Sequence, residues 1–326
     1  MLLEVEDLVT DFPFGDRRIP IVDHVSFGLE KGRCLAIVGE SGCGKSMTAM
    51  SLMRLVARPG RVSNGRILLE GRDVLACSVP EMRAIRGNQM SMIFQEPMTS
   101  LNPVVRVGAQ LMEALHLHAD LSKDEARRRG IELFDKVGIP DPAQRFDDYP
   151  HQLSGGMRQR VMIAMALCTE PRILLADEPT TALDVTIQKQ ILDLISRLQR
   201  ELETAVLLIT HDLGVVNQVA DDIAVMYAGR IVERGPRAQV LHDPGHPYTK
   251  GLLASLPGRG RPGERLHEIP GTVPSPQNWG PGCRFAPRNP ECRPECAEMP
   301  PVMRPYKEGE VAYCAHRLAE LEEPAA

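Results

Sequence analysis

The sequence lacks any long hydrophobic run, and this absence limits the functions open to it. A membrane-spanning helix needs about 18–20 consecutive apolar residues, whereas the apolar stretch 161–168 covers only eight positions and fits a buried core helix. Residues 1–6 lack the basic start and apolar core of a signal peptide. We therefore expect neither a membrane span nor export, and we expect any membrane contact to be made through partner proteins.

An excess of positive charge is also missing. The chain carries 38 Lys and Arg against 43 Asp and Glu, a formal net charge of −5, so it offers no basic field for nucleic acid. We expect no nucleic-acid partner, and the basic run 127–129 fits the solvated face of an amphipathic helix. With 43% hydrophobic residues and a single Trp, the 326-residue chain otherwise has an ordinary globular composition.

One segment has the pattern of a phosphate-binding loop. It reads Gly39-Glu40-Ser41-Gly42-Cys43-Gly44-Lys45-Ser46 and fits G-x-x-x-x-G-K-[ST] at every defined position. The segment follows a short apolar stretch, 34–38, and precedes a predicted helix, so backbone N–H groups can close on an anion at a helix N-terminus. Lys45 should reach the β- and γ-phosphates, and the Ser46 hydroxyl should ligate Mg²⁺.

A second segment ends a predicted core strand, 173–176, in the acidic pair Asp177-Glu178. At the carboxyl end of such a strand the Asp177 carboxylate can hold Mg²⁺, and Glu178 can polarise an attacking water. A third segment, Leu153-Ser154-Gly155-Gly156-Met157, precedes this strand and begins a predicted helix, an anion site with small residues.

Together, in this order, the three segments resemble those of the ATP-binding subunit of an ABC transporter. The resemblance implies ATP and Mg²⁺ as cofactors and a P-loop NTPase fold of the α/β class. It implies three further catalytic or coupling positions: Gln95 as the Q-loop glutamine, which touches the Mg²⁺–water network, Asp184 in the D-loop that begins at Thr181, and His211 as the switch histidine. It also implies that Ser154, Gly155 and Gly156 meet the γ-phosphate bound by an opposite subunit, so that catalysis requires a dimer.

The resemblance also sets the expected domain organisation. We expect an ATPase domain over residues 1–235, with an antiparallel β subdomain and a helical subdomain inserted at about 97–165, and a small loop-rich extension over 236–326. Strands are expected over 2–9 and 22–29, and a short helix with a frayed tail over 318–326. In the family an aromatic residue upstream of the P-loop stacks on adenine. Phe12 is our choice, with Phe14 as the alternative.

Further segments resemble one branch of ABC importers, the ATP-binding subunits for dipeptides, oligopeptides and nickel. These segments are 94–103, 149–153, 246–249, 269–274 and 282–285. The resemblance implies an ATPase that powers import of short peptides, with nickel or another small solute as the alternative and a soluble ABC ATPase less favoured. It also implies the cytoplasmic face of a bacterial inner membrane, two permease subunits, a second ATPase that is a paralogue or a copy, and an extracytoplasmic solute-binding protein. The sequence does not name the solute.

Cysteines are the remaining feature. Cys34, Cys43, Cys77 and Cys168 are scattered and should be structural thiols in a reducing compartment. Four others share a Pro-rich segment and could bind zinc or an iron–sulfur cluster: Cys283, Cys292, Cys296 and Cys314. The importer branch carries a comparable tail that can hold a 4Fe–4S cluster, which makes that group the favoured occupant, with zinc or unliganded thiols as alternatives. The usual second cysteine position is Asn289 here, and Cys292 could substitute for it.

Overall fold

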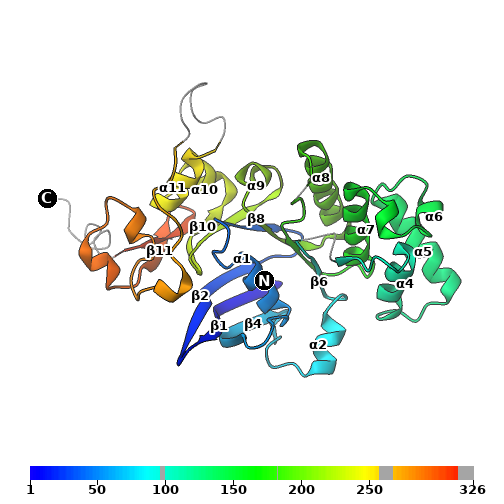
Figure 1. Cartoon of the computed structure of the whole chain (residues 1–326), viewed down its shortest axis with the longest axis horizontal. Helices are drawn as coiled ribbons and strands as arrows, with labels where there is room; N and C mark the ends of the chain where they lie inside the picture. Colours follow the sequence, from blue (N-terminus) through cyan, green and yellow to red (C-terminus); the bar gives the residue numbers. More distant parts are fainter. Residues whose placement is uncertain (96–99, 182, 257–266, 315–326) are drawn as a thin grey trace. The chain divides into compact units, whose positions relative to one another are not determined.

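The structure, a computed structural model, describes residues 1–326 except 96–99, 182, 257–266 and 315–326 (Figure 1). Contacts within the chain divide it into two compact units. The first comprises Met1–Leu2, Leu29–Cys34 and Asp73–Ile209, and the second comprises Leu3–Gly28, Leu35–Arg72 and Thr210–Ala326. The described residues contain no helix both long and apolar enough to cross a membrane.

The second unit begins with an antiparallel sheet in the order β2-β1-β4-β5. Its strands are β1 (Leu3–Phe14), β2 (Arg17–Leu29), β4 (Arg61–Leu69) and β5 (Arg72–Asp73). Alternate β1 residues such as Leu3 and Val5 are buried, which is the pattern of a half-buried strand. The two predicted strands exist, but β1 and β2 extend well beyond the bounds 2–9 and 22–29 because pairing continues past the apolar residues.

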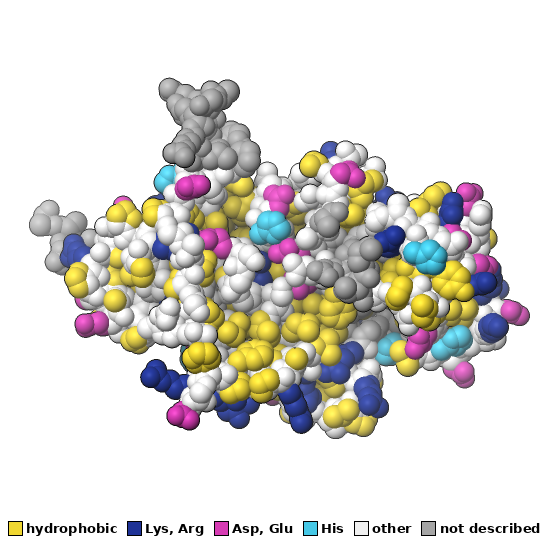
Figure 2. Space-filling view, viewed as in Figure 1, with side chains coloured by type: hydrophobic (Ala, Val, Ile, Leu, Met, Phe, Trp, Pro, Cys, Tyr) yellow, Lys and Arg dark blue, Asp and Glu magenta, His cyan; other side chains and the backbone are white. Residues whose placement is uncertain are grey.

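Basic side chains gather over this sheet, along the lower rim in Figure 2. Arg18 and Arg61 both pair with Asp11, and Arg66 pairs with Glu6 across the β1–β4 register. The carboxylate of Asp11 accepts a hydrogen bond from Arg18. Burial by itself would raise the pKa of Asp11, but its hydrogen bonds and the charges of Arg18 and Arg61 lower it. These arginines therefore serve as cross-strand partners of the sheet.

A parallel pair carries the phosphate loop in the same unit. Strand β3 (Cys34–Val38) is wholly buried, lies parallel to β9 (Asp222–Tyr227) and leads into α1 (Lys45–Leu52). The antiparallel neighbour of β9 is β10 (Arg230–Pro236). Three short helices complete this part: α9 (Leu213–Val219), α10 (Arg237–His242) and α11 (Pro247–Ala254).

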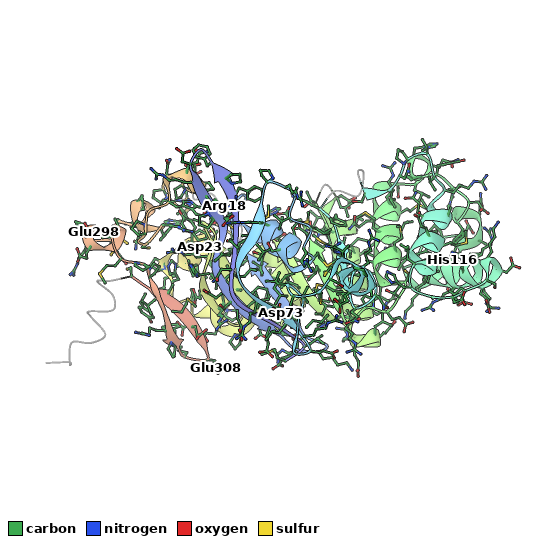
Figure 3. All side chains as sticks on the ribbon, turned by 90° about the horizontal axis from the view of Figure 1, so that it is seen from below. Arg18, Asp23, Asp73, His116, Glu298 and Glu308 are labelled. Atoms are coloured by element: carbon green, nitrogen blue, oxygen red, sulfur yellow. The ribbon has the colours of Figure 1, made fainter. Side chains whose placement is uncertain are left out.

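The C-terminal segment contains more regular structure than its composition predicts. Three 3₁₀ turns are followed by a hairpin: η2 (Pro276–Asn278), η3 (Ala286–Arg288), η4 (Pro294–Ala297), β11 (Val302–Tyr306) and β12 (Gly309–Tyr313). Glu308 lies at the tip of the hairpin (Figure 3), and β12 pairs antiparallel with β10. The hairpin thus extends the sheet of the second unit to the order β11-β12-β10-β9-β3. The helix expected over 318–326 lies outside the described residues.

The first unit contains three parallel strands in the order β8-β7-β6. They are β6 (Met90–Ile93), β7 (Ile173–Asp177) and β8 (Ala205–Thr210), all fully buried, as expected for a parallel core sheet. The helices of this unit are α2 (Val79–Ile85), α4 (Val107–His116), α5 (Lys123–Lys136), α6 (Pro142–Arg145), α7 (Gly155–Leu167) and α8 (Val185–Leu202), with the 3₁₀ turn η1 (Pro150–Gln152).

The inserted helices form where the charged, periodic pattern predicts them. Ser122 begins α5 with a capping box, in which the Glu125 carboxylate accepts a hydrogen bond from the Ser122 backbone N–H. The rings of Phe134 and Phe146 pack at 5.3 Å in the core of this bundle, and His116 marks the end of α4 (Figure 3). Helix α2 was not predicted, although its own capping box at Ser78 was readable in the sequence.

Candidate nucleotide site

The phosphate loop joins β3 to α1 and is closed by its own lysine. Lys45 is 5% exposed, and its Nζ donates hydrogen bonds to the backbone oxygens of Gly39 at 2.8 Å and Glu40 at 3.0 Å. The ammonium is therefore held over the loop, where phosphate oxygens would replace these carbonyls as its acceptors. Ser46, in the first turn of α1, belongs to a helix N-terminus that favours anions.

Two loop positions require glycine. Gly44 has a φ of 109°, and a Cβ there would lie 2.7 Å from the Ile21 oxygen. At Gly39 a Cβ would lie 2.1 Å from the Met226 oxygen, so the loop could not approach β9. Cys43 is fully buried, and burial raises the pKa of its thiol. Its neutral side chain fills space in the loop and supplies no charge.

The acidic pair lies at the end of β7 in the first unit. Asp177 is 4% exposed, and Glu178 turns away from the strand with a φ of 44°, a left-handed conformation that non-glycine residues seldom adopt. The Glu178 Oε2 accepts hydrogen bonds from Gln95 Nε2 at 3.2 Å and from Thr181 Oγ1 at 2.9 Å. The structure thus brings together the predicted base and the predicted Q-loop glutamine.

The predicted signature and D-loop residues are helix caps in the same unit. The hydroxyl of Ser154 accepts a hydrogen bond from Met157 N at the start of α7, and Asp184 Oδ1 accepts one from Ile187 N at the start of α8. A Cβ at Gly156 would lie 3.0 Å from Ile187, so these two helix N-termini are neighbours. Ser154 and Gly155 are exposed, and their N-terminus is therefore accessible to an anion.

The remaining predicted nucleotide contacts lie in the second unit. His211 follows β8 and is exposed. Phe12 is half-buried near the end of β1, where its ring covers Gly60, at which a Cβ would lie 2.4 Å from the ring. Phe14 is 53% exposed. The adenine-stacking role of Phe12, with Phe14 as the alternative, stays a prediction.

Three of the four tail cysteines form a thiol cluster. The sulfur atoms of Cys292, Cys296 and Cys314 all lie within 4.8 Å of one another, with Cys296 and Cys314 buried. Cys283 is linked to this cluster because its N–H donates to the Cys296 oxygen at 2.7 Å. All four sulfurs are soft ligands of the kind that zinc and iron–sulfur clusters use, so the donor set fits either group.

The thiols of Cys283 and Cys292, on either side of Asn289, interact with each other. The hydrogen bond between the side chains of Cys292 and Cys283 lowers the pKa of Cys283 and raises that of Cys292, so Cys283 is the more readily ionised of the pair. Asn289, at the usual cysteine position, donates from Nδ2 to the Cys292 sulfur at 3.4 Å. The Cys292 sulfur therefore belongs to the thiol cluster, and Asn289 holds it by this hydrogen bond.

Three residues with clear roles in this geometry were not among the predicted site residues. Thr181 holds Glu178, while Tyr248 and Arg288 both contact Glu40 of the phosphate loop. Thr181 had a signal, because it lies at the start of the predicted D-loop. Tyr248 lies in the segment 246–249 that resembles the importer branch, but nothing in the sequence indicated that Tyr248 or Arg288 contacts Glu40, which lies more than 200 positions earlier.

Two family models match the sequence. The model for "ABC transporter" matches residues 22–181, and the model for "Oligopeptide/dipeptide transporter, C-terminal region" matches residues 232–296. The first match contains the phosphate loop, Gln95, the signature and the acidic pair, and the second contains Cys283, Cys292 and Cys296.

Curated relatives match almost end to end. Three from Bacillus subtilis (strain 168) are the oligopeptide transport ATP-binding proteins AppD and OppD and the dipeptide transport ATP-binding protein DppD. AppD is 49% identical over 96% of both chains. OppD is 52% identical over 88% of this chain and 81% of its own, and DppD is 52% identical over 92% and 90%.

Solved structures share the ATPase fold. The dimeric ATP-binding cassette MJ0796, in a post-hydrolysis state bound to ADP and Pi, is 25% identical, with a TM-score of 0.65 over 72% of this chain and 98% of its own. The cbiO1 protein of Clostridium perfringens, part of the ABC transporter complex cbiONQ, is 27% identical, with a TM-score of 0.63 over 74% and 91%. The predicted α/β fold class with a P-loop ATPase core is confirmed.

Proposed function

Because the chain belongs to the ABC transporter family of ATP-binding proteins, in the branch that carries the oligopeptide/dipeptide C-terminal region, we propose that it hydrolyses ATP to power import of short peptides. The observation that carries this proposal is the 49% identity to AppD over 96% of both chains. The match extends beyond the ATPase core into residues 232–296, which favours a transporter subunit over a soluble ABC ATPase. The relatives quoted above are named for oligopeptides and dipeptides, so nickel import is not the better alternative.

The chain's own residues supply the steps of hydrolysis. Lys45 would bind the β- and γ-phosphates. Ser46, Gln95 and Asp177 would hold Mg²⁺ through hydroxyl, amide and carboxylate oxygens, and the bound ion would neutralise charge that develops on the phosphates. Glu178 accepts the proton of the attacking water, and His211 contacts the γ-phosphate. Gln95 and Thr181 orient the Glu178 carboxylate through the two hydrogen bonds to its Oε2.

The assembly around this subunit follows from the same family. We propose that Ser154, Gly155 and Gly156 close over the ATP bound by a second ATPase subunit, with Asp184 at the contact between the two. Two permease subunits would anchor the pair at the cytoplasmic face of the inner membrane, and an extracytoplasmic binding protein would deliver the peptide.

A capture experiment tests this assembly. A Glu178→Gln variant should bind ATP and stay closed, so affinity purification from solubilised membranes with ATP and Mg²⁺ should recover two permease subunits and a second ATPase. The Lys45→Ala variant is the matched control, since it should not close. Recovery of soluble partners alone, by a variant shown to bind ATP, would contradict the transport function.

We also propose that Cys283, Cys292, Cys296 and Cys314 hold a 4Fe–4S cluster. The thiol cluster of the last three and the link of Cys283 to Cys296 support this proposal. The cluster would stabilise the fold of this segment, because the 3₁₀ turns around it bury little apolar core by themselves.

Anaerobic purification followed by iron, sulfide and zinc analysis tests the cluster. About four iron and four sulfide per chain are expected for a Cys₄ site of this type, with loss of both in Cys296→Ser. Cys168→Ser is the control, since burial raises the pKa of the Cys168 thiol to about 11 and it lies apart from the tail in the sequence. A colourless protein with one zinc, or with no metal, would overturn the iron–sulfur assignment.

A further inference from the structure

The C-terminal region contacts the phosphate loop directly. The N–H of Glu40, the second residue of the loop, donates to the Tyr248 hydroxyl at 3.0 Å. Nη1 of Arg288 lies 2.9 and 3.2 Å from the two Glu40 carboxylate oxygens. One loop residue is therefore held through both its backbone and its side chain by residues of the C-terminal region.

Both partners of Glu40 are themselves firmly held. Tyr248 is fully buried in α11, with its ring 4.6 Å from that of Tyr227, and burial raises the pKa of its phenol, so the hydroxyl stays neutral. The Arg288 side chain is 5% exposed, and its Nε donates to the Pro270 oxygen at 2.8 Å. Burial works against the Arg288 charge, but its hydrogen bonds with the Glu40 carboxylate favour the charged form, and the pKa of Arg288 is raised.

A second contact supports the loop from the same region. The Trp279 indole covers Gly229, where a Cβ would lie 2.8 Å from the ring. The N–H of Gly229 donates to the Cys43 oxygen at 2.8 Å, so the turn under Trp279 is bonded to the loop.

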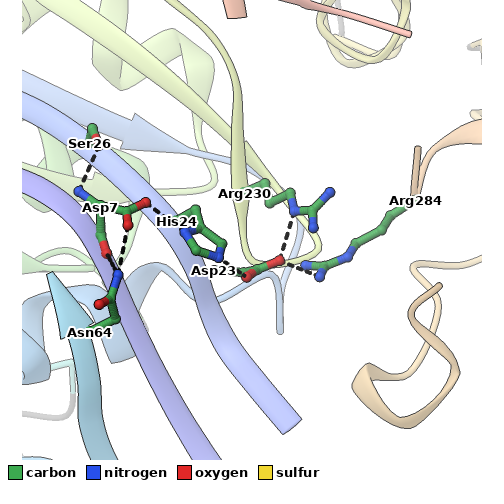
Figure 4. A network of polar contacts seen from close by, with 7 residues as sticks. All are labelled: Asp7, Asp23, His24, Ser26, Asn64, Arg230 and Arg284. Atoms are coloured by element: carbon green, nitrogen blue, oxygen red, sulfur yellow. Dashed lines mark hydrogen bonds and ion pairs between the residues drawn. The ribbon is translucent and has the colours of Figure 1, made fainter. Parts of the chain in front are cut away.

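The tail is anchored to the antiparallel sheet at the same place. Arg284 lies 4.0 Å from the Trp279 ring centre and forms a buried ion pair with Asp23 of β2. Arg230 donates to the same Asp23 carboxylate at 2.7 Å (Figure 4). The position of the tail is thus fixed independently of Glu40, so Arg288 is presented to the loop by a preformed surface.

We propose that Tyr248 and Arg288 form a clamp that positions the phosphate loop for ATP, an inference that rests on the proposed ATPase function. The Glu40 carboxylate stands beside the triphosphate site, where an unpaired negative charge would repel ATP. Arg288 cancels that charge, and Tyr248 fixes the backbone that carries it. The C-terminal region is therefore a part of the ATP site in this chain.

Equilibrium binding of ATP with Mg²⁺ to the full chain tests the clamp. Because Arg288→Leu removes a hydrogen-bonded charge pair, we expect it to raise the Kd of ATP about tenfold. Arg288→Lys should raise this Kd less, and Tyr248→Phe should raise it about threefold. When Glu40 is already replaced by Gln, Arg288→Leu should raise the Kd of ATP by less than half as much, because no Glu40 charge is then left unpaired. Thermal unfolding of each variant is measured alongside.

Two controls separate the possible failures. Arg234→Leu removes another arginine of the same unit, which pairs with Glu310 on β12, and should leave the Kd unchanged. Lys45→Ala should abolish binding. If the wild type does not bind ATP, or if Lys45→Ala binds equally well, the proposed ATPase function fails. The clamp alone is wrong if the wild type binds ATP normally and a folded Arg288→Leu variant binds ATP as tightly as the wild type. It is also wrong if Arg288→Leu weakens ATP binding equally with Glu40 and with Gln at position 40.

Discussion

At the scale of single residues, the conformation of Glu178 bears most directly on its proposed role as the catalytic base. A residue held at a φ of 44° costs about 1–3 kcal/mol unless its surroundings impose it. Here the Glu178 N–H donates to the Ile209 oxygen at 2.9 Å, and its carboxylate is held by Gln95 and Thr181. These contacts turn the carboxylate out of the strand direction, where a water can reach it.

We predict that Glu178→Gln lowers ATP hydrolysis at least about 100-fold, since a positioned general base contributes about 10²–10⁴-fold. ATP affinity should stay within about threefold of the wild type, because the amide keeps the side chain's size and an oxygen acceptor. The rate of phosphate release from the assembled transporter and the Kd of ATP are the two measurements. Glu170→Gln, at an exposed glutamate of the same unit with a φ of 54°, is the matched control and should hydrolyse normally. Equal rates in the two variants would contradict the role of Glu178.

At the scale of elements, one buried carboxylate joins β10 to α11. Glu233 is fully buried, and its two oxygens accept the N–H groups of Gly245 at 2.7 Å and His246 at 3.0 Å. The His246 ring nitrogen Nδ1 then accepts the N–H of Tyr248 at 3.1 Å, at the start of α11. A buried carboxyl group on a strand of the sheet thus binds the two residues that precede the helix carrying Tyr248.

Glu233→Ala should lower the free energy of unfolding by about 3 kcal/mol, because it leaves two buried N–H groups without an acceptor. Urea unfolding followed by circular dichroism measures this change. Glu310→Ala, on the neighbouring strand β12, is the matched control, since its pair with Arg234 is partly exposed and should contribute at most about 1 kcal/mol. A loss at Glu233 no larger than at Glu310 would show that the carboxylate does not hold α11.

The elements also show where sequence patterns suffice. Strands β3 and β7 lie within one residue of the apolar stretches 34–38 and 173–176, because short apolar runs next to glycine-rich or acidic segments have few alternatives. The hairpin of β11 and β12 was not predicted. Its apolar residues are few, and β12 forms a strand by pairing with β10, with Val311 opposite Glu233, which lies 78 positions earlier.

At the scale of the whole molecule, the signature and D-loop caps belong to one unit and the phosphate loop to the other. The solved relative MJ0796 is dimeric, and the exposed N-terminus of α7 at Ser154 offers the anion site that such a dimer would use. In the dimer that we propose, ATP would lie between the phosphate loop of one chain and the signature of another.

We therefore predict that Glu178→Gln with ATP and Mg²⁺ shifts in light scattering from 36.0 kDa toward twice that mass. Without nucleotide, or with Lys45→Ala in addition, the mass should stay at that of one chain. A Glu178→Gln variant that binds ATP yet keeps the single-chain mass would show that the chain does not pair with itself. The pairing would then have to be sought with a paralogous ATPase.

The sequence by itself determined the chemistry of this protein. The phosphate loop, the signature and the acidic pair are local patterns, in which the residue types and their spacing already define the strand, loop and helix that carry the groups. The four tail cysteines were likewise readable from type and spacing, whereas the departure at Asn289 came from the resemblance to the importer branch.

Only the tertiary structure decided what holds these groups in place. Thr181 contacts Glu178 because β7 turns sharply after Asp177, and Tyr248 and Arg288 contact Glu40 across 208 and 248 positions of chain. Such contacts depend on packing between segments distant in the sequence, which no local pattern encodes. Thus the sequence predicted the groups that we propose act on ATP, and the fold brought the C-terminal region into contact with the phosphate loop.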